Sequence, residues 1–373
     1  MTSGRTVPLG RRNLTEDTRR AALSIGGVAV ALLLVLVLDG IFAGAIRQVT
    51  AYLRTLPADV VVSQQGVRTM HMSASALPPT TAERAAAVAG VAWVAPIWYA
   101  SGVVATATGR QVSYVIGYDP ATGRGGPTRL VAGRTPTDGE VVLDELGADQ
   151  LGVRIGGRVT VFGAPHTVAG LSAGQTSITN TMAFVAVADF TRHVPRPASY
   201  LLVGARPGTD PAALAARLAT ALPATTVQTR TEFVDSEARI VTDMSAAIMQ
   251  IMALLGLLVA LAVVVLSLYA LTLFKLREYG VVAALGGSPW RLARIVTAQA
   301  VWTAAGALAA ATGLALLLGA VIGRVGPQIS IVVTAPSVAR LGVAALAASL
   351  AGAQLPIYRL ARLDPAVAFR RQS

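Results

Sequence analysis

Two long uncharged runs on either side of a short basic segment constrain this chain most. Residues 248–273 carry no charged side chain, and neither do residues 295–323. The segment that joins them reads LTLFKLREYGVVAALGGSPWRLAR from Leu271 to Arg294. About 20 apolar residues, at a rise of about 1.5 Å each, span the hydrocarbon core of a bilayer. Each run is therefore predicted to be a transmembrane helix, with the basic segment held at a membrane face.

Two further apolar stretches predict two more spans. One begins at residue 21 and continues to about residue 46, and the other covers residues 341–356 after a shorter apolar stretch. Residues 49–241 have an ordinary soluble composition, although the whole chain is 54% hydrophobic with a mean hydropathy of +0.60. The sequence therefore predicts an α-helical membrane protein with four transmembrane helices and one large α+β domain between the first and second.

The distribution of arginine predicts the orientation. The N-terminal tail, the 271–294 segment and the C-terminal tail together hold 13 basic and 4 acidic residues, whereas residues 49–241 hold 15 arginines and 13 acidic residues. Cytoplasmic segments carry the excess of Lys and Arg. Both termini and residues 275–294 are thus expected in the cytoplasm, and residues 49–241 outside. The net charge of +12 then reflects topology and contact with membrane lipids, and no nucleic-acid partner is expected.

Cysteine and histidine usage limits the other kinds of site. The chain has no cysteine, so the stability of the outer domain must come from its own core. His71, His166 and His193 are isolated in the sequence without paired ligand spacing, which predicts no metal site. The first apolar stretch also resembles a signal peptide, but it extends too far and carries Asp39 near the supposed cleavage point, so retention is favoured.

Alternation and turn residues predict the elements of the outer domain. Strands are expected at 58–62, 91–98, 101–108, 111–117, 140–143, 158–162, 166–171, 200–205 and 226–230, and helices at 80–88, 145–151 and 211–222. The part around 133–195 is interpreted as a β-rich insertion. A helix that begins near Glu232 should run unbroken into the second span and end near Phe274, with its polar start serving as a stalk.

These patterns divide the chain into nine segments. They are a cytoplasmic tail with an interfacial helix (1–20), helix 1 (21–46), the extracytoplasmic domain (47–241), helix 2 (242–274, its stalk extending outward from about 232), a cytoplasmic coupling loop (275–294), helix 3 (295–323), a short outer loop (324–333), helix 4 (334–357) and a cytoplasmic tail (358–373).

The 271–294 segment resembles the signature of FtsX-like, MacB-type permeases of ABC transport systems. The residues that match the family pattern are Arg277, Glu278, Gly280, Ala284, Leu285, Gly286 and Ser288. The run 361–366 resembles the closing segment of the family, and the runs 90–96, 115–120 and 133–143 resemble its periplasmic domain. Departures are Phe274-Lys275 in place of Glu-Arg, Ala283 in place of arginine and Gln299 in place of an acidic residue, so ion pairs through those positions are absent.

The resemblance implies that the basic segment docks onto an ATPase. Residues 277–285, stopped by Gly286-Gly287, are expected to form a short amphipathic helix on the cytoplasmic face. The candidate ATPase-coupling residues are Arg277, Glu278, Tyr279, Gly280, Val281, Val282, Leu285, Gly286 and Ser288. The alternative is a plain amphipathic turn packed on its own bundle.

No catalytic constellation is predicted. Lys275 is the single lysine, so the chain has no Gly-x-x-x-x-Gly-Lys phosphate-binding loop. Ser172, His166 and Asp189 could be imagined as a hydrolytic set, but no nucleophile-elbow context surrounds the serine. The chain is thus expected not to be an enzyme and to hold no cofactor, with ATP and Mg bound by the partner ATPase.

The resemblance implies a multi-pass permease of a bacterial cell membrane. It would couple a cytoplasmic ABC ATPase dimer to movement of the outer domain, for export or extraction of a lipid, lipoprotein, peptide or drug at the outer face. A second permease copy is required because a two-fold ATPase dimer presents two docking surfaces, and a homodimer is favoured. The alternatives are an FtsX-type regulator of a cell-wall hydrolase or signalling partner, and a membrane-anchored binding domain without an ATPase.

Overall fold

The computed structural model describes residues 18–71, 73–175, 181–274, 289–326 and 330–361. The chain forms two compact units. The first, which we call the sheet domain, comprises residues 44–244 with 326–329, and the second, the helical unit, comprises residues 1–43, 245–325 and 330–373. Two helices, α2 (Thr18–Val49) and α8 (Arg230–Phe274), contribute residues to both units.

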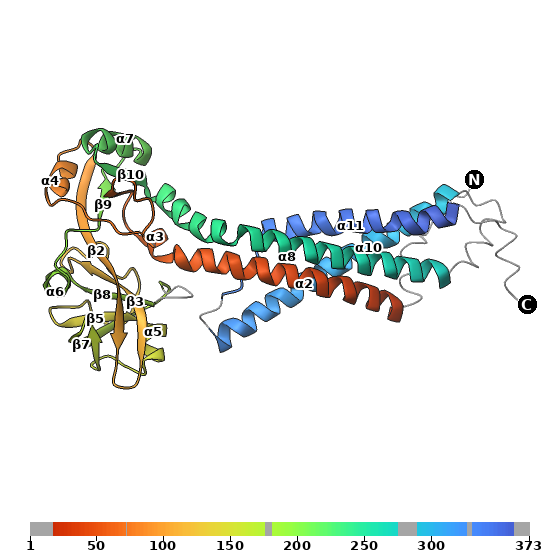
Figure 1. Ribbon diagram of the computed structural model, residues 1–373, viewed down its shortest axis with the longest axis horizontal. Helices are drawn as coiled ribbons and strands as arrows, with labels where there is room; N and C mark the ends of the chain where they lie inside the picture. Colours follow the sequence, from red (N-terminus) through yellow and green to blue (C-terminus); the bar gives the residue numbers. More distant parts are fainter. Residues whose placement is uncertain (1–17, 72, 176–180, 275–288, 327–329, 362–373) are drawn as a thin grey trace, which may run out of the picture. The chain divides into compact units, whose positions relative to one another are not determined.

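The sheet domain is built on a ten-stranded sheet with the strand order β10-β1-β9-β2-β3-β8-β5-β7-β4, and β6 pairs with β2 and β7 off that path (Figure 1). Its strands are β1 (Val60–Gln64), β2 (Val91–Ala105), β3 (Arg110–Tyr118), β4 (Leu130–Gly133), β5 (Glu140–Asp144), β6 (Arg158–Val161), β7 (Ala164–Ser172), β8 (Thr181–Ala186), β9 (Tyr200–Ala205) and β10 (Thr225–Thr229). The β3–β8 and β5–β7 pairs are parallel, and the other pairs are antiparallel. The α+β class predicted from the sequence is confirmed.

Five short helices accompany the sheet. They are α3 (Ala51–Thr55), α4 (Thr80–Ala86), α5 (Glu145–Gln150), α6 (Val187–His193) and α7 (Pro211–Ala221). The start of α7 follows from its sequence, because the Asp210 side chain accepts a hydrogen bond from the Ala213 N–H and proline occupies the first turn. Leu214 and Leu218 of α7 are fully buried in a cluster with Val60 of β1, which holds this helix on the sheet.

Two local features differ from the sequence-based expectation. β2 is one continuous strand where two were predicted, because Tyr99 and Ala100, at the expected break, stay paired with Ile116 and Val115 of β3. The β6–β7 hairpin turns at Phe162-Gly163, whose φ angles are 51° and 81°, so β7 begins at Ala164, two residues earlier than predicted. Positive φ at both central residues is the conformation that tight two-residue hairpin loops need.

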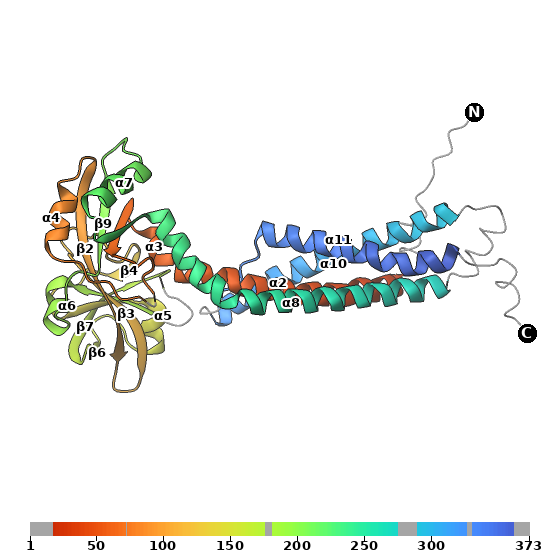
Figure 2. The ribbon, with the colours of Figure 1, turned by 45° about the horizontal axis from the view of Figure 1, so that its top comes forward.

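The helical unit contains parts of α2 and α8 together with α10 (Pro289–Val325) and α11 (Ala335–Ala361), drawn in Figure 2. Among the described residues, three segments are long and apolar enough to cross a membrane, Ala22–Val49, Val296–Val325 and Ala335–Gln354, and a shorter apolar stretch covers Gln250–Val263 within α8. These segments support the predicted transmembrane character, and the count of four spans stays a prediction.

Small residues form the contacts between these helices. The buried cluster of the helical unit consists mostly of alanine, with members from α2, α10 and α11. A Cβ atom on Gly27 of α2 would lie 2.9 Å from Val263 of α8, and one on Gly342 of α11 would lie 2.9 Å from Leu308 of α10. Small side chains let helix backbones approach closely in a lipid environment, where apolar burial alone gives no preference for contact.

Candidate functional site

The predicted coupling residues, Arg277 to Ser288, lie outside the described residues, and α10 begins directly after them at Pro289. The described site with the most direct bearing on coupling is therefore the place where α3 and α8 enter the core of the sheet domain. Tyr52 and Leu53 of α3 and Phe233 and Val234 of α8 are all buried in one hydrophobic cluster. We call this site the stalk anchor and define it as Tyr52, Leu53, Leu56, Phe233, Val234 and Glu237.

Glu237 is the polar centre of the stalk anchor. Its side chain is fully buried, and its carboxylate accepts hydrogen bonds from the backbone N–H of Met70, with an N···O distance of 2.6 Å, and of His71, at 3.2 Å. The Nδ1 atom of His71 lies 2.6 Å from the Glu237 Oε1 atom. A buried carboxylate costs several kcal/mol unless its oxygens are satisfied. Here α8 is bonded through one side chain to a loop about 167 residues earlier in the chain.

Aromatic rings enclose this carboxylate. The His71 ring centroid lies 4.6 Å from that of Tyr114 and 6.3 Å from that of Tyr99. The Tyr200 ring packs against Phe233 with a centroid distance of 5.8 Å, and its hydroxyl donates to the Thr69 carbonyl at 3.1 Å. Burial raises the pKa of Tyr99 and of Tyr200 above the ordinary range, and the nearby Glu237 charge adds to both shifts. These tyrosines therefore stay neutral around the anchor.

The first turn of α8 is fixed by further polar contacts. The Arg230 N–H donates to the Asp59 carbonyl at 2.9 Å, and its Nη1 donates to the carbonyls of Arg54 at 3.1 Å and Leu56 at 3.2 Å. Tyr52 of α3 donates from its hydroxyl to the Gly125 carbonyl at 2.7 Å. The start of α8 and the chain just after α2 are thus attached to the same part of the sheet domain.

The role of Glu237 was not predicted from the sequence. The polar stretch from Asp235 to Arg239 was interpreted only as a stalk, yet the structure buries Glu237 completely. The available signal was spacing, because Phe233, Val234 and Glu237 share one face of a helix at intervals of three and four residues. That spacing marks the face, but only the fold shows that a loop with free backbone N–H groups lies opposite it.

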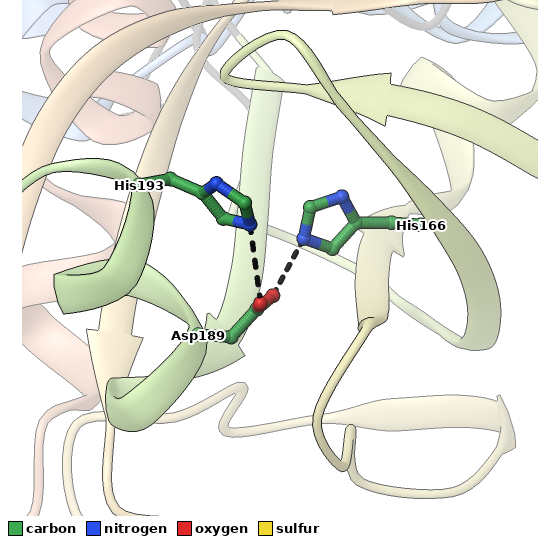
Figure 3. Close-up of side chains that lie close together, drawn as sticks. All are labelled: His166, Asp189 and His193. Atoms are coloured by element: carbon green, nitrogen blue, oxygen red, sulfur yellow. Dashed lines mark hydrogen bonds and ion pairs between the residues drawn. The ribbon is translucent and has the colours of Figure 1, made fainter.

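A second polar group lies elsewhere in the sheet domain, where β7 meets α6 (Figure 3). The Nε2 atom of His166 lies 2.5 Å from the Asp189 Oδ2 atom, and the Nε2 atom of His193 lies 3.5 Å from Asp189 Oδ1. The side chains of His166 and Asp189 are buried, and that of His193 is 26% exposed. This grouping differs from the isolation of the histidines that was expected from the sequence. Ser172, the third residue of the hydrolytic set considered in the sequence, instead has its Oγ atom 3.5 Å from the Leu143 carbonyl oxygen.

Local packing explains how these residues meet. Phe162, in the β6–β7 turn, stacks edge-on against Phe190 of α6 with a centroid distance of 5.3 Å. Phe190 is fully buried and neighbours Asp189, so the aromatic pair positions α6 beside the hairpin. His193 follows Asp189 by four residues and lies on the same face of the helix.

The helical unit holds an apolar cavity of about 650 Å³ between parts of α2, α8 and α11. Its lining includes Leu36, Phe42, Met252, Leu254 and Leu341. Asp39 and Arg340 also line it, and the Arg340 Nη2 atom lies 3.4 Å from an Asp39 carboxylate oxygen. This pair joins α2 to α11 at a position where the predicted spans contain few other charges.

Comparison with known families gives two matches that together cover most of the chain. Residues 21–221 match the MacB-like periplasmic core domain, and residues 250–365 match the FtsX-like permease C-terminal domain. No curated protein sequence matches the chain.

Solved structures similar to part of the chain include two extracytoplasmic domains. The periplasmic region of MacB from Actinobacillus actinomycetemcomitans shares 14% identity with a TM-score of 0.39, covering 49% of this chain and 94% of that one. The extracellular domain of the ABC-type transporter YknZ from Gram-positive bacteria shares 13% identity with a TM-score of 0.38, covering 46% of this chain and 99% of that one.

Proposed function

This chain belongs to the FtsX-like, MacB-type family of ABC transporter permeases, and we propose that it carries ATP-driven motion from a cytoplasmic ATPase to its sheet domain. Members of this family are membrane subunits that act with a separate ABC ATPase and are normally not catalytic themselves. The proposed action is mechanical. Closure of the ATPase moves the membrane helices, and α8 moves the sheet domain.

The stalk anchor is the observation that supports this proposal. Both α3, directly after α2, and the first turns of α8 are buried in the same hydrophobic cluster. Glu237 adds polar bonds whose removal would leave buried groups unpaired. Because α8 is one helix from Arg230 to Phe274, no flexible linker separates the anchor from the membrane-spanning part of the helix. Such a connection favours transmission of motion from α8 to the sheet domain. A domain on a flexible tether would not follow the helix in this way.

The remaining parts of the proposal concern partners and placement. Arg277, Glu278 and the apolar residues up to Leu285 would contact the ATPase, with ATP and Mg bound there. Two copies of the permease would form a homodimer among membrane lipids, with both termini in the cytoplasm. The substrate would be a lipid, lipoprotein, peptide or drug handled at the outer face. Regulation of a cell-wall hydrolase or signalling partner would use the same motion.

A flexible insertion in α8 tests mechanical coupling. Because the chain has no cysteine, a single Thr220→Cys substitution on α7 gives one spin-label site per copy. In the complex with its co-purified ATPase, trapping with ATP and vanadate should shift the distance between the labels of two copies. Insertion of Gly-Gly-Ser after Arg239 should abolish that shift while ATP hydrolysis continues. The same insertion after Thr108, in the β2–β3 turn, should preserve it.

Two results would contradict this account. A full shift in the Arg239 insertion variant would mean that α8 does not carry the motion. The absence of any shift in the otherwise unmodified labelled complex, with ATP turnover present, would mean that the sheet domain does not move with ATP.

A second experiment tests the docking segment. Val282→Pro should break the predicted short helix, because proline in a helix interior costs about 3 kcal/mol and removes a backbone donor. We expect the ATPase to be lost from the purified complex while expression and membrane insertion stay normal. Leu292→Ala, beyond the predicted docking residues, serves as the control. Normal ATPase binding by the proline variant would show that this segment is only a turn.

A further inference from the structure

We propose that His166, Asp189 and His193 bind one late first-row divalent metal ion, best matched by Zn²⁺, which links α6 to the β6–β7 hairpin. The three residues each offer one ligand atom, and all these atoms lie within 4.8 Å of one another. Two imidazole nitrogens and one carboxylate oxygen form a donor set that zinc and its neighbours prefer. Figure 3 shows both rings turned with a nitrogen toward the Asp189 carboxylate.

The hydrogen bonding of His166 prepares its Nε2 atom for a cation. Its Nδ1 atom lies 2.9 Å from the Ala164 carbonyl oxygen, which can only accept, so Nδ1 carries a proton. In the neutral ring the Nε2 lone pair then points at the Asp189 Oδ2 atom, 2.5 Å away. Two lone pairs repel at that distance, so either a proton or a metal ion must lie between them. A backbone carbonyl on the far nitrogen is the usual second partner of a metal-bound histidine.

The distances fit a metal ion after small side-chain rotations. Zinc binds nitrogen and carboxylate oxygen at about 2.0–2.2 Å, which places neighbouring ligand atoms about 3.3 Å apart in a tetrahedron. The 3.5 Å between His193 Nε2 and Asp189 Oδ1 already meets this spacing. The 2.5 Å between His166 Nε2 and Asp189 Oδ2, the other carboxylate oxygen, must open by somewhat less than 1 Å. The ligand nitrogens of the two histidines, within 4.8 Å of each other, must come to the same spacing, and side-chain rotations provide both changes. His193, at 26% exposed, gives the ion a path from solvent.

The surrounding charges favour a cation. Arg192 donates to Asp189 Oδ1 at 3.1 Å, which would oppose metal binding if its charge were uncompensated. However, both terminal nitrogens of Arg192 are paired with the Asp138 carboxylate at 2.8 Å. With neutral imidazoles, the two carboxylates and one guanidinium leave a net negative charge around the three ligand atoms. The ion would therefore link α6 to the β6–β7 hairpin at a place where oppositely charged side chains already lie close together.

Metal binding is tested on the full-length chain in detergent, purified with a histidine-free affinity tag and stripped with a chelator. Titration with Zn²⁺ should show one ion per chain at low-micromolar free zinc, and Co²⁺ should give visible d–d absorption. His193→Ala and Asp189→Asn should each weaken binding by about 100-fold or more. His193 is the more informative variant, since its partial exposure makes loss of folding a poor explanation.

A matched control separates this site from other carboxylates. Asp149→Asn removes an exposed carboxylate on α5. This variant should bind zinc as the unmodified chain does. Zinc should also slow hydrogen exchange of residues 158–172 and 187–193 together. The absence of saturable zinc and cobalt binding, or unchanged binding by His193→Ala, would overturn the proposal and leave a proton between His166 and Asp189.

Discussion

Different kinds of side chain fill the interior of the sheet domain and the interior of the helical unit. The largest fully buried residues of the sheet domain are aromatic, among them Tyr118, Tyr200 and Phe184. The buried cluster of the helical unit is mostly alanine. Aromatic burial is driven by the removal of apolar surface from water, whereas helices in lipid gain mainly from close contact of small residues. The two units are thus built by different physical means.

The surfaces of the sheet domain and the helical unit also differ. In the helical unit, Leu254, Leu316 and Leu317 are each more than half exposed. The sheet domain exposes fewer large apolar side chains, and its buried acids Glu237 and Asp189 have close polar partners. An exposed leucine surface is expected of a helix in lipid and would be a liability in water. We therefore expect the stability of the sheet domain to be sensitive to the loss of buried polar bonds. The stability of the helical unit should be sensitive to the size of the side chains between its helices.

The largest expected effect comes from removal of the polar centre of the stalk anchor. Glu237→Ala leaves two backbone N–H groups and His71 without their acceptor, so it should destabilise the sheet domain by about 3–5 kcal/mol. Hydrogen exchange of β1 and β2 peptides in the full-length chain would measure this change. Glu237→Gln retains an acceptor and should cost less, about 1–3 kcal/mol. A loss below about 1 kcal/mol for the alanine variant would refute the importance of this carboxylate.

The next largest effect is expected from overpacking the contact between two helices of the helical unit. A Cβ atom on Gly256 of α8 would overlap the Val35 side chain of α2. Gly256→Leu should therefore destabilise the α2–α8 contact by about 1–3 kcal/mol through overpacking. Gly313→Leu provides the control, since a Cβ atom there meets nothing within 4 Å. Hydrogen-exchange rates of α2 peptides, measured in detergent, would distinguish the two variants. Equal rates would show that Gly256 does not determine the packing of α2 against α8.

The smallest effect concerns an ion pair at the surface of the sheet domain. Hydrogen bonds from Arg134, at 2.6 Å, and from Thr137 lower the pKa of Glu140 to about 2 from its ordinary 4.5. A carboxyl group with a depressed folded-state pKa stabilises the fold above its unfolded pKa, and this stabilisation is lost as the pH falls through the folded value. Glu140→Gln should thus slightly lower the melting temperature at pH 7, and the difference should shrink between pH 4.5 and pH 2. A constant difference over that range would exclude this pair as its cause.

Much of the fold could be predicted because it depends on local patterns. The charge-free runs and the polar start near Glu232 predicted α8 closely, and it extends from Arg230 to Phe274. Valine-rich residues predicted β1, and the Asp210-Pro211 pair predicted the start of α7. The break expected at residues 99–100 was wrong because β2 changes partner there, from β9 up to Ile97 to β3 from Trp98, and stays paired throughout.

The candidate sites were less predictable because they depend on contacts between distant segments. Glu237 meets Met70 only after α8 is placed against the core, and Asp189 meets His166 only after α6 packs on the β6–β7 hairpin. Spacing along one helix cannot indicate the strand order that brings such segments together. The coupling residues from Arg277 to Ser288 were assigned from a local motif, and their role stays a prediction.

The pairing of β1 with β10 has a consequence for biosynthesis. Val60 lies opposite Thr229, so the strand made first pairs with the strand made last, 169 residues later. The other neighbour of β1 is β9, which is also translated late. On the ribosome, β1 must therefore wait unpaired while almost the whole domain is made, and such non-local pairing is slow to form. Closure of this seam should be a late step of maturation, and until then the valine-rich strand stays exposed to non-native contacts.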